Sequence, residues 1–484
     1  MICIPLTTKT ETDSLAAIDA ANKHADIIEI RLDYLDDPNC AQKLIKHSTV
    51  PIIATWRKIE DGGCNDCNDN IRLQWLQKAA NWGANYIDVE LEYADEFPPQ
   101  SNTKIIVSHH DFKGFPNDFE TILENIRKHP LCDIAKIAVK IDKIQDNLRI
   151  FQALKTSKKE TIALGMGELG LISRIATKKF GGYLTFASLT KGTESAPGQI
   201  TASELRNRFR YDKINTDTKI YGIIANPVGH SMSPDIHNAA FDKLNLNCLY
   251  LPFKVDGEPN AFIEDFKQIP VYGYSVTIPH KESVQKSLSQ IEPLAQQIGA
   301  VNTIVMQKNN ELHGYNSDCW AAINAVENKI NLTDKNCLII GAGGAARAIA
   351  FGLQSRQANI SICNRTFEKA QNLAKECNGL AITQAEVQSI KWDVILNTTS
   401  VGMSPNTDET PFDKNGFTPN CVVFDAIYNP LETKLLKEAN SKQAKTINGV
   451  EMFIAQGARQ FELWTGAKAP KDIMQNVMLA KLKN

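Results

Sequence analysis

Eight short apolar segments recur through the first part of the chain, and each is separated from the next by a stretch that could hold a helix. The segments are residues 2–7, 26–33, 51–57, 86–91, 104–111, 134–140, 161–167 and 183–188. Alternating strands and helices build a parallel sheet, and eight such repeats in about 210 residues match a small (β/α)₈ barrel in number and size. We therefore predict an α/β fold that begins with a (β/α)₈ TIM barrel.

Polar side chains collect where these predicted strands end. Seven of them lie at or after strand C-termini: Glu29, Arg31, Arg57, His110, Arg174, Ser195 and Gln199. Barrel enzymes build their active sites on the face where the strands end. We therefore expect these side chains to converge, although they are far apart in the sequence.

The sixth segment carries Lys136 and Lys140 inside an otherwise apolar strand. Their spacing of four places both on one face of the strand. Burying a lysine is costly unless it is paired or loses its proton, and a neutral amine can attack a ketone to form a Schiff base. Lys140 lies nearer the strand end, so the residues alone do not choose between the two lysines. Pairing of a barrel lysine with Glu29 is the structural alternative.

Other residues supply the remaining groups that Schiff-base chemistry requires. The iminium acidifies the neighbouring carbon, and His110 on the preceding strand is a suitable base for that proton. Arg57 and Arg174 offer bidentate forks for a substrate carboxylate. The alternative is that the histidines of "SHHD" belong to an ordinary turn at the strand end.

A second α/β series follows a polar stretch. Residues 336–354 read as a strand, a glycine-rich turn and an Ala-rich helix, which is typical of a doubly wound dinucleotide-binding sheet. Gly341 permits the tight turn, and Gly343 lets the backbone approach a pyrophosphate. The next strand ends at Asn364 and Arg365 instead of an acidic residue. A guanidinium suits a 2′-phosphate, which favours NADP over NAD, although an ordinary surface arginine is the alternative.

These rhythms predict the domain organisation. We expect the barrel at residues 1–210 and a linker at 211–219, followed by the second α/β series. The family resemblance of the second half, given below, implies a substrate-binding catalytic domain at 220–320 completed by 450–484 and a Rossmann-like NADP-binding domain at 321–449.

Two further segments of the second half indicate proton transfer. Pro279 fits the first turn of a helix, which would place Lys281 near a helix N-terminus, where the dipole disfavours an ammonium. Asp318 precedes an apolar helix and is either its N-cap, as Ser317 could be, or the partner of a lysine. A lysine and a carboxylate that meet form a proton-transfer pair for reducing a ketone. Ser233, which precedes a proline, fits a helix cap as well as a ligand-binding role.

Composition excludes some classes of partner. Lys plus Arg (53) nearly balances Asp plus Glu (55), which does not indicate a nucleic acid or a membrane surface as partner. No apolar run approaches the ~20 residues of a membrane span. Eleven cysteines, many in apolar strands, suit a reducing compartment, and we expect the cytoplasm. The pair Cys64 and Cys67 is weak evidence for zinc or redox chemistry, so we expect no metal and interpret it as incidental.

The motifs of the first half resemble, in order, those of the type I 3-dehydroquinate dehydratases: "EIRLD", "ATWRK", "SHHDF", "IAKIAV", "ISR" and "SAPGQI". The resemblance implies that Lys136 forms the Schiff base, that His110 is the general acid/base and that Glu29 is held near this histidine. It implies substrate binding by Arg31, Arg57, Arg174, Ser195 and Gln199. The sequence departs from the family at Asp61, where a glutamate is usual.

The motifs of the second half resemble those of the shikimate dehydrogenases: "SMSP", "SVTIPHK", "AVNT", "NSD", "GAGGAAR", "NRT", "NTTSVGM" and "AQGA". The resemblance implies that Lys281 and Asp318 are the catalytic pair. It implies shikimate contacts at Ser231, Ser233, Thr277, Asn302, Tyr428 and Gln456. It implies NADP contacts at Gly341, Ala342, Gly343, Gly344, Ala345, Asn364, Arg365 and Thr366. "GYSVTIPHKE", with Ser275, looks most like the fused plant-type enzymes.

The tandem resemblance predicts a bifunctional enzyme of the shikimate pathway, which leads to the aromatic amino acids. The barrel would dehydrate 3-dehydroquinate to 3-dehydroshikimate through the lysine Schiff base. The second half would reduce 3-dehydroshikimate to shikimate with NADPH. Two alternatives are a quinate dehydrogenase activity in the second half and a catalytically silent regulatory relative.

Overall fold

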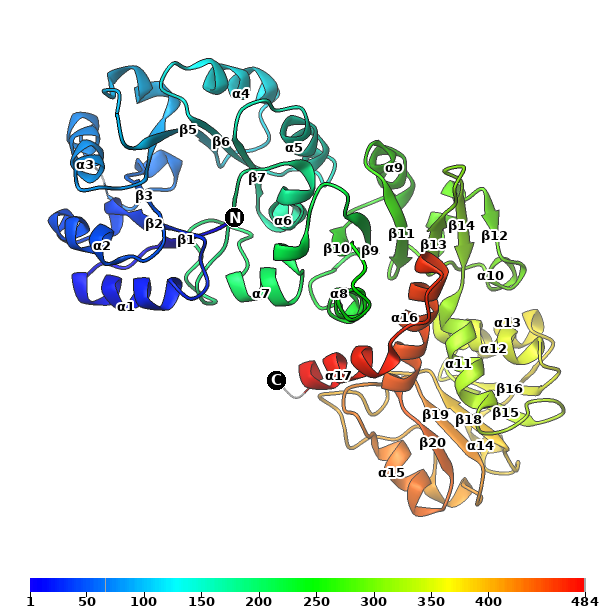
Figure 1. Cartoon of the computed structure of the whole chain (residues 1–484). Coiled ribbons are helices and arrows are strands. Elements are labelled where there is room, and N and C mark those ends of the chain that lie inside the picture. The colour runs from blue at the N-terminus through cyan, green and yellow to red at the C-terminus, as the bar shows by residue number, and fades with distance from the viewer. Residues whose placement is uncertain (66, 483–484) are drawn as a thin grey trace. The chain divides into compact units, whose positions relative to one another are not determined.

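The structure is a computed structural model that describes residues 1–65 and 67–482 (Figure 1). The chain divides into two compact units. The first comprises Met1–Ile220, Asn247–Asp256 and Phe262–Pro270, and the second comprises the other described residues.

Eight parallel strands form the sheet of the first unit in the order β7-β6-β5-β4-β3-β2-β1-β8. They are β1 (Ile2–Leu6), β2 (Ile27–Arg31), β3 (Ile52–Thr55), β4 (Tyr86–Glu90), β5 (Lys104–Asp111), β6 (Ile134–Lys140), β7 (Thr161–Met166) and β8 (Thr185–Phe186). A backbone hydrogen bond of 2.9 Å from the Tyr183 N–H to the Thr161 carbonyl joins β7 to the segment before β8. The sheet is therefore a near-closed barrel, which confirms the predicted fold class.

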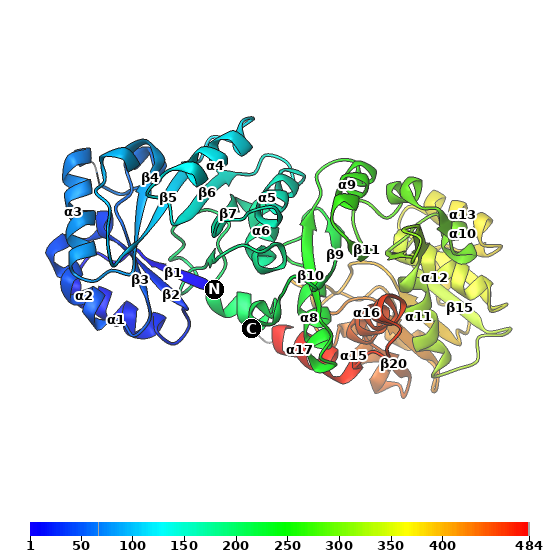
Figure 2. The ribbon, with the colours of Figure 1, turned by 45° about the horizontal axis from the view of Figure 1, so that its top comes forward.

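The helices lie outside the barrel strands (Figures 1 and 2). They are α1 (Glu11–Ala21), α2 (Ala41–His47), α3 (Asp69–Asn81), α4 (Phe119–Lys128), α5 (Asp146–Lys155), α6 (Leu171–Ile175) and α7 (Ala202–Asn207). Between β4 and β5 a 3₁₀ helix at Leu91–Glu96 takes the place of an α-helix. Pro98 and Pro99 follow after the C-cap residue Phe97, and proline cannot continue a helical hydrogen-bond ladder.

In strands β2 and β6, the side chains that point into the barrel change from apolar to charged along the strand. In β2, Ile27 is followed at intervals of two by Glu29 and Arg31, and in β6, Ile134 is followed by Lys136. Residues two apart share a strand face, so the apolar members form one layer at the N-terminal end of the strands. The charged members lie above this layer, at the end of the barrel where enzymes of this fold build their sites.

The predicted linker at residues 211–219 begins with ordered, packed residues. The Tyr211 side chain is fully buried and Ile214 nearly so. The Lys178 ammonium donates to the Tyr211 carbonyl over 3.3 Å and lies 5.4 Å from the Tyr211 ring centre. The first residues of this stretch therefore belong to the packing of the first unit.

Six strands of a mixed sheet follow: β9 (Lys219–Ala225), β10 (Cys248–Lys254), β11 (Val271–Val276), β12 (Gln290–Ile291), β13 (Thr303–Met306) and β14 (Leu312–Tyr315). β13 pairs antiparallel with β11 and β14, and β12 pairs parallel with β14. The accompanying helices are α8 (Ser233–Lys243), α9 (Pro259–Asp265), α10 (Pro293–Ile298) and α11 (Ser317–Glu327).

The last sheet is parallel, with the order β17-β16-β15-β18-β19-β20. Its strands are β15 (Asn336–Ile340), β16 (Asn359–Cys363), β17 (Leu380–Ala381), β18 (Val394–Asn397), β19 (Val422–Asp425) and β20 (Lys445–Ile447). The helices are α12 (Gly344–Gln354), α13 (Phe367–Glu376), α14 (Gln384–Val387) and α15 (Lys434–Ser441). This is the 3-2-1-4-5-6 order of the Rossmann fold, and it reverses beside β15, where such folds bind dinucleotides.

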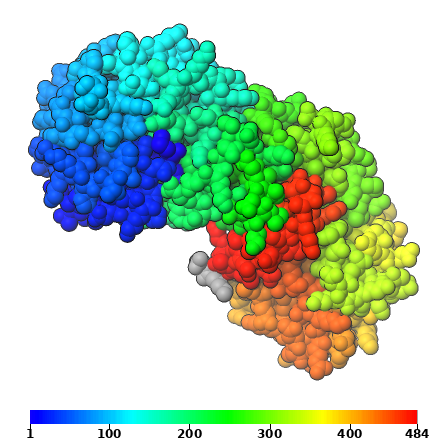
Figure 3. All heavy atoms as spheres, in the orientation of Figure 1, coloured from blue at the N-terminus to red at the C-terminus, as the bar shows by residue number. Residues whose placement is uncertain are grey.

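The C-terminal helices α16 (Gly449–Thr465) and α17 (Lys471–Leu482) return to pack against α8, as the red and green segments of Figures 1 to 3 show. α16 also packs against α11 and β13. Among the described residues, no helix combines the length and the apolar character that crossing a membrane would require.

Candidate active sites

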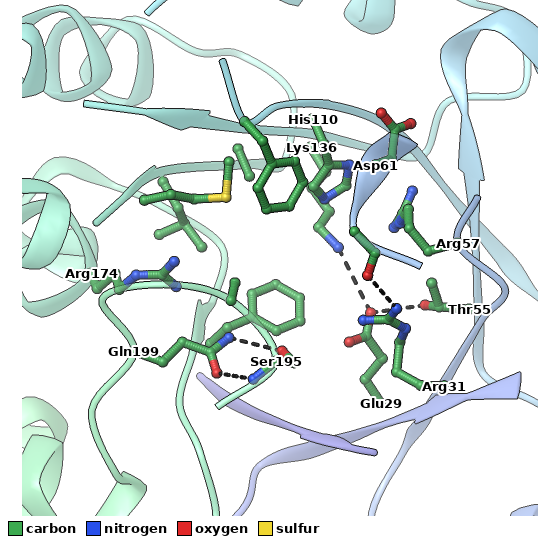
Figure 4. Close-up of a pocket in the computed structure, with 17 residues that line it drawn as sticks. Glu29, Arg31, Thr55, Arg57, Asp61, His110, Lys136, Arg174, Ser195 and Gln199 are labelled. Carbon is green, nitrogen blue, oxygen red and sulfur yellow. Dashed lines mark hydrogen bonds and ion pairs between the residues drawn. The ribbon is translucent and has the colours of Figure 1, made fainter. Parts of the chain in front are cut away.

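A pocket opens at the C-terminal ends of the barrel strands, and Figure 4 shows the side chains that converge on it. All barrel site residues expected from the sequence line it: Glu29, Arg31, Arg57, His110, Lys136, Arg174, Ser195 and Gln199. Asp61 lines it as well, and burial raises the pKa of this carboxyl. The residues come from six different strands or the loops that follow them, so the barrel closure is what assembles the pocket.

Lys136 and not Lys140 reaches this pocket. The Lys136 side chain is 6% exposed, and its Nζ lies 2.7 Å from Asp88 Oδ2 and 3.8 Å from Glu29 Oε1. Lys140 is exposed, and its ammonium donates to the Lys113 carbonyl over 3.4 Å. The expected pairing with Glu29 is present, but the nearer partner is Asp88.

Asp88 and Glu90 complete a buried charge network that the sequence reasoning missed. Asp88 Oδ1 lies 2.8 Å from the Arg57 guanidinium, which is also 3.4 Å from Glu90. Burial opposes the charge on Asp88, yet Arg57 and Lys136 outweigh it and hold the pKa of Asp88 well below its usual range. Burial likewise opposes the charge on Arg57, but Asp88 and Glu90 raise its pKa. Both groups are therefore ionised.

His110 is poised as a neutral base. Burial first, and then the positive charges of Arg57 and Lys136, hold the pKa of His110 well below its usual value. Its Nδ1 is buried and has no hydrogen-bond partner among the described residues. The ring stacks on Phe112 at a centroid distance of 6.5 Å. The Glu29 carboxylate accepts the Thr55 hydroxyl and pairs with Lys136, so the structure places this carboxylate beside the lysine.

The three arginines of the pocket differ in their charge balance. Arg31 forms a two-point ion pair with Asp33, at 2.8 and 2.6 Å, and Arg57 pairs with Asp88 and Glu90. Arg174 has no acidic partner among the described residues and donates only to the Pro197 carbonyl, over 3.4 Å. Burial lowers the pKa of Arg174 to about 10. Arg174 is thus the pocket cation that lacks a counter-charge.

Two hydrogen bonds between Gln199 and Ser195 shape the pocket wall beside Arg174 (Figure 4). The Gln199 side chain accepts the Ser195 N–H over 3.0 Å and donates to the Ser195 hydroxyl over 3.0 Å. This pair of bonds fixes both side chains at the pocket without a bound molecule.

The second pocket, about 370 Å³, lies in the second unit. It is lined by every substrate-side and catalytic residue expected for that half: Ser231, Ser233, Thr277, Lys281, Asn302, Asp318, Tyr428 and Gln456. Lys281 Nζ lies 2.6 Å from Asp318 Oδ2. The proton-transfer pair expected from the sequence is therefore assembled.

The local structure around this pair differs from the sequence expectation. No helix begins at Pro279: the next helical element is a 3₁₀ helix at Ser283–Ser287, and the Lys281 carbonyl accepts the Val301 N–H over 2.8 Å. The N-cap of α11 is Asn316, whose side chain accepts the Cys319 N–H over 3.0 Å. Asp318, in the first turn of α11, is thereby left to pair with Lys281.

The serine before Pro234 is not a helix cap either. Ser233 is the first residue of α8 and the N-cap is Met232, while the Ser233 N–H donates to the Ser231 hydroxyl over 3.2 Å. The buried Ser233 lines the second pocket, so its placement agrees with a ligand contact.

Asn302 is held in one orientation at the floor of this pocket. Its Oδ1 accepts the Ser317 N–H over 2.7 Å, the Ser317 hydroxyl over 3.1 Å and the Thr303 hydroxyl over 2.8 Å. Because the oxygen is saturated, the amide NH₂ group is the one directed at a ligand.

The third pocket, about 890 Å³, lies at the switch point of the Rossmann sheet. Gly341, Ala342, Gly343, Asn364, Arg365 and Thr366 line it, whereas Gly344 and Ala345 open helix α12. Gly341 has a φ of +118°, and a Cβ there would stand 2.4 Å from Thr398 Oγ1. The loop therefore requires glycine, and the exposed Arg365 stands beside it at the end of β16. This cradle fits a dinucleotide that carries an additional phosphate.

The loop pair Cys64 and Cys67 flanks residue 66, which lies outside the described residues. Within the described part of the chain, no group of three or more His, Cys, Asp and Glu side chains is arranged to hold a metal ion.

Comparison with known proteins agrees with the geometry of these sites. The model of type I 3-dehydroquinase matches residues 2–216. The model of the shikimate dehydrogenase substrate-binding domain matches 223–304, that of shikimate/quinate 5-dehydrogenase 324–406, and that of the shikimate 5′-dehydrogenase C-terminal domain 449–479.

The bifunctional 3-dehydroquinate dehydratase/shikimate dehydrogenase of Arabidopsis thaliana, a chloroplastic protein, is 38% identical over 99% of this chain and 84% of its own length. The chain belongs to this bifunctional family. It is therefore an enzyme with a lyase half and an oxidoreductase half.

Relatives of the second half alone are also similar. The shikimate dehydrogenase (NADP(+)) of Methanocaldococcus jannaschii is 44% identical over 56% of this chain and 99% of its own length. A crystal structure of shikimate dehydrogenase in complex with NADP+ covers 56% of this chain and 98% of its own, with 43% identity and a TM-score of 0.52.

Proposed function

We propose that the barrel dehydrates 3-dehydroquinate to 3-dehydroshikimate on Lys136, and that the second unit reduces 3-dehydroshikimate to shikimate with NADPH. The observation that carries the first activity is a buried lysine with a neutral histidine in one pocket. The observation that carries the second is the 2.6 Å contact between Lys281 and Asp318.

In the barrel, Lys136 forms a carbon–nitrogen bond to the substrate ketone, and the carbonyl oxygen leaves as water. The iminium withdraws electrons from the neighbouring carbon, and His110 takes the proton from that carbon. The protonated His110 then returns this proton to the departing hydroxyl, which leaves as a second water. Addition of water to the product iminium releases 3-dehydroshikimate and restores the ammonium of Lys136.

Arg174 binds the substrate carboxylate. The other two arginines of the pocket already have carboxylate partners, whereas Arg174 is buried without one. A bidentate pair with a carboxylate restores charge balance at this position. Ser195 and Gln199 hold the adjoining hydroxyl groups, and Asp61 is a further carboxyl that lines the pocket.

In the second unit, Lys281 and Asp318 supply the proton that the ketone oxygen gains as it becomes a hydroxyl. NADPH supplies the hydride when it is bound. The Gly341–Gly343 loop accommodates its pyrophosphate, and Asn364, Arg365 and Thr366 hold its 2′-phosphate. Asn302, Ser231, Ser233 and Gln456 hold the hydroxyl and carboxylate groups of shikimate, and Tyr428 closes the substrate side of the pocket.

Quinate is a second candidate substrate for the same pocket, because the family model that matches residues 324–406 includes quinate dehydrogenases. Shikimate and quinate differ by the elements of water, so the alcohols are tested side by side with NADP and with NAD. A higher kcat/KM for quinate would overturn the assignment of shikimate.

We also propose the domain boundaries given in the sequence analysis. We further propose that the protein is located in a reducing compartment, the cytoplasm. The eleven cysteines of the sequence, many of them buried, support a reducing compartment, since thiols persist there.

Borohydride trapping tests the dehydratase. Protein is mixed with 3-dehydroquinate, reduced and digested, and the modified peptide is located by mass. A reduced adduct on Lys136, and none on a Lys136→Met variant, is expected. An adduct on Lys140 would move the nucleophile, and no adduct with substrate unconsumed would refute the proposed dehydratase. Oxidation of NADPH by 3-dehydroshikimate tests the reductase.

A further inference from the structure

Six buried side chains of alternating charge run through the barrel from helix α3 to strand β2. In spatial order they are Arg72, Glu90, Arg57, Asp88, Lys136 and Glu29, all at most 6% exposed. Successive partners lie 3.2, 3.4, 2.8, 2.7 and 3.8 Å apart. Three cations and three anions balance, so the charge of this network depends on the state of the Lys136 nitrogen.

Asp88 is the central anion of this network. Its Oδ2 faces Lys136 alone at 2.7 Å, while Oδ1 receives the Ser108 hydroxyl at 2.6 Å and the Arg57 guanidinium at 2.8 Å. The side chain is fully buried and does not line the pocket. Asp88 therefore reaches a substrate only through Lys136.

We propose that Asp88 is the counter-ion of the Lys136 nitrogen throughout the dehydration, pairing first with the ammonium and then with the iminium. This inference rests on the Schiff-base function proposed above. It makes Asp88 a positioning residue for a reaction in which Lys136 is the nucleophile and His110 the acid and base.

The charge balance of the covalent step supports this role. The Lys136 ammonium gives one proton to His110, and the freed lone pair forms a bond to the carbonyl carbon. A proton moves from nitrogen to the resulting oxyanion, and His110 returns its proton to that hydroxyl, which leaves as water. The nitrogen starts as an ammonium and ends as an iminium, one positive charge in each case. A fixed anion at 2.7 Å therefore stabilises both states, without a change in network charge.

Glu29 does not fill this position equally well. Its Oε1 is 3.8 Å from Lys136 and accepts the Thr55 hydroxyl over 2.8 Å. The pair it makes with the lysine is longer than a hydrogen bond. Removing the charge of Asp88 therefore leaves the iminium with only the more distant carboxylate.

The test is an Asp88→Asn variant of the full chain, which keeps size and removes the charge. We expect the dehydratase kcat to fall at least 100-fold with KM within about threefold. We also expect the fraction of protein trapped by borohydride at saturating 3-dehydroquinate to fall at least tenfold. Unchanged shikimate dehydrogenase activity in the same preparation shows that the second unit is folded. A thermal unfolding curve shows whether the barrel is folded.

Two further variants separate charge from packing. Asp88→Glu retains a carboxylate and is expected to trap at least ten times more adduct than Asp88→Asn. Ser108→Ala leaves the charge in place and is expected to give the full adduct. If the Asp88→Asn barrel does not fold, the amount of trapped adduct is compared between Asp88→Glu and the wild type. An amount within tenfold of the wild type supports a role of the charge. The absence of any adduct in Asp88→Glu overturns the inference.

Specific results would overturn the inference. Wild-type trapping in Asp88→Asn would show that the iminium needs no anion here. A raised KM with unchanged kcat would show that Asp88 acts only by holding Arg57. An absence of adduct in the wild-type protein would instead refute the proposed dehydratase, so the two failures are distinguishable.

Discussion

We predict that removing the charge of Arg174 raises the stability of the barrel and lowers its dehydratase activity. Burial without an acidic partner lowers the pKa of this guanidinium to about 10. The ordinary pKa of arginine is at least about 12.5, and each pKa unit corresponds to about 1.36 kcal/mol, so the free enzyme carries about 3 kcal/mol of unfavourable charge burial. A bound carboxylate removes this cost.

The perturbation is Arg174→Gln, which keeps a polar side chain and removes the charge. We expect the free barrel to become more stable, by about 1–3 kcal/mol, since the burial cost disappears while the Pro197 contact can be replaced. We expect kcat/KM for 3-dehydroquinate to fall about 10²–10³-fold, as for the loss of a two-point charged hydrogen bond.

Urea unfolding of the barrel and the appearance of the conjugated product measure the two effects. Arg127→Gln is a matched control, because burial also lowers the pKa of Arg127 but this residue does not line the pocket. Its kinetics should equal those of wild type. A destabilised Arg174→Gln barrel, or an unchanged kcat/KM, would refute the reasoning that Arg174 holds an unmatched charge for the substrate.

Three other predictions follow from the sites. The lowered pKa of His110 keeps the imidazole neutral in acid, so kcat/KM of the dehydratase should stay level as pH falls through 6.5 and decline only at lower pH; a decline centred at 6.5 or above contradicts this. Lys281→Met or Asp318→Asn should lower the reductase kcat about 10²–10⁴-fold and leave dehydratase rates unchanged in the same sample. Arg365→Ser should raise KM for NADPH about 10–100-fold and leave KM for NADH unaltered; a parallel rise for both would exclude a 2′-phosphate contact.

Local patterns in the sequence were enough to predict the strands and the polar residues of the barrel pocket, whereas residues of the second pocket such as Thr277 and Tyr428 came from the family resemblance. β5 and β6 have the predicted bounds, and the polar residues at strand ends converge because parallel strands end on one face of a barrel. What remained hidden depends on contacts between distant segments. The Lys281 carbonyl accepts the Val301 N–H from a segment 20 residues away, a contact that the helix expected from Pro279 did not anticipate.

Asp88 was missed for a related reason. In "YIDVEL", Asp88 and Glu90 alternate with apolar residues, and such alternation is also typical of a strand with one face in water. Only the barrel closure turns both carboxylates inward, next to Arg57 and Lys136. The signal that could have predicted this ion pair is that one predicted strand carries acidic residues on the face that points into the barrel, while another carries a lysine on the same inward face.

Both halves of the enzyme place a lysine beside an aspartate, and solvent access separates their chemistry. The side chains of Lys136 and Asp88 are 6% and 0% exposed, whereas those of Lys281 and Asp318 are 32% and 20% exposed. A reductase consumes a proton in every turnover, so its donor pair must exchange protons with water. An iminium must instead persist long enough for the neighbouring proton to be removed, which favours a site that excludes all but the reacting water. Burial therefore suits Lys136 to covalent catalysis and partial exposure suits Lys281 to proton supply, although the two ion pairs are almost equally short.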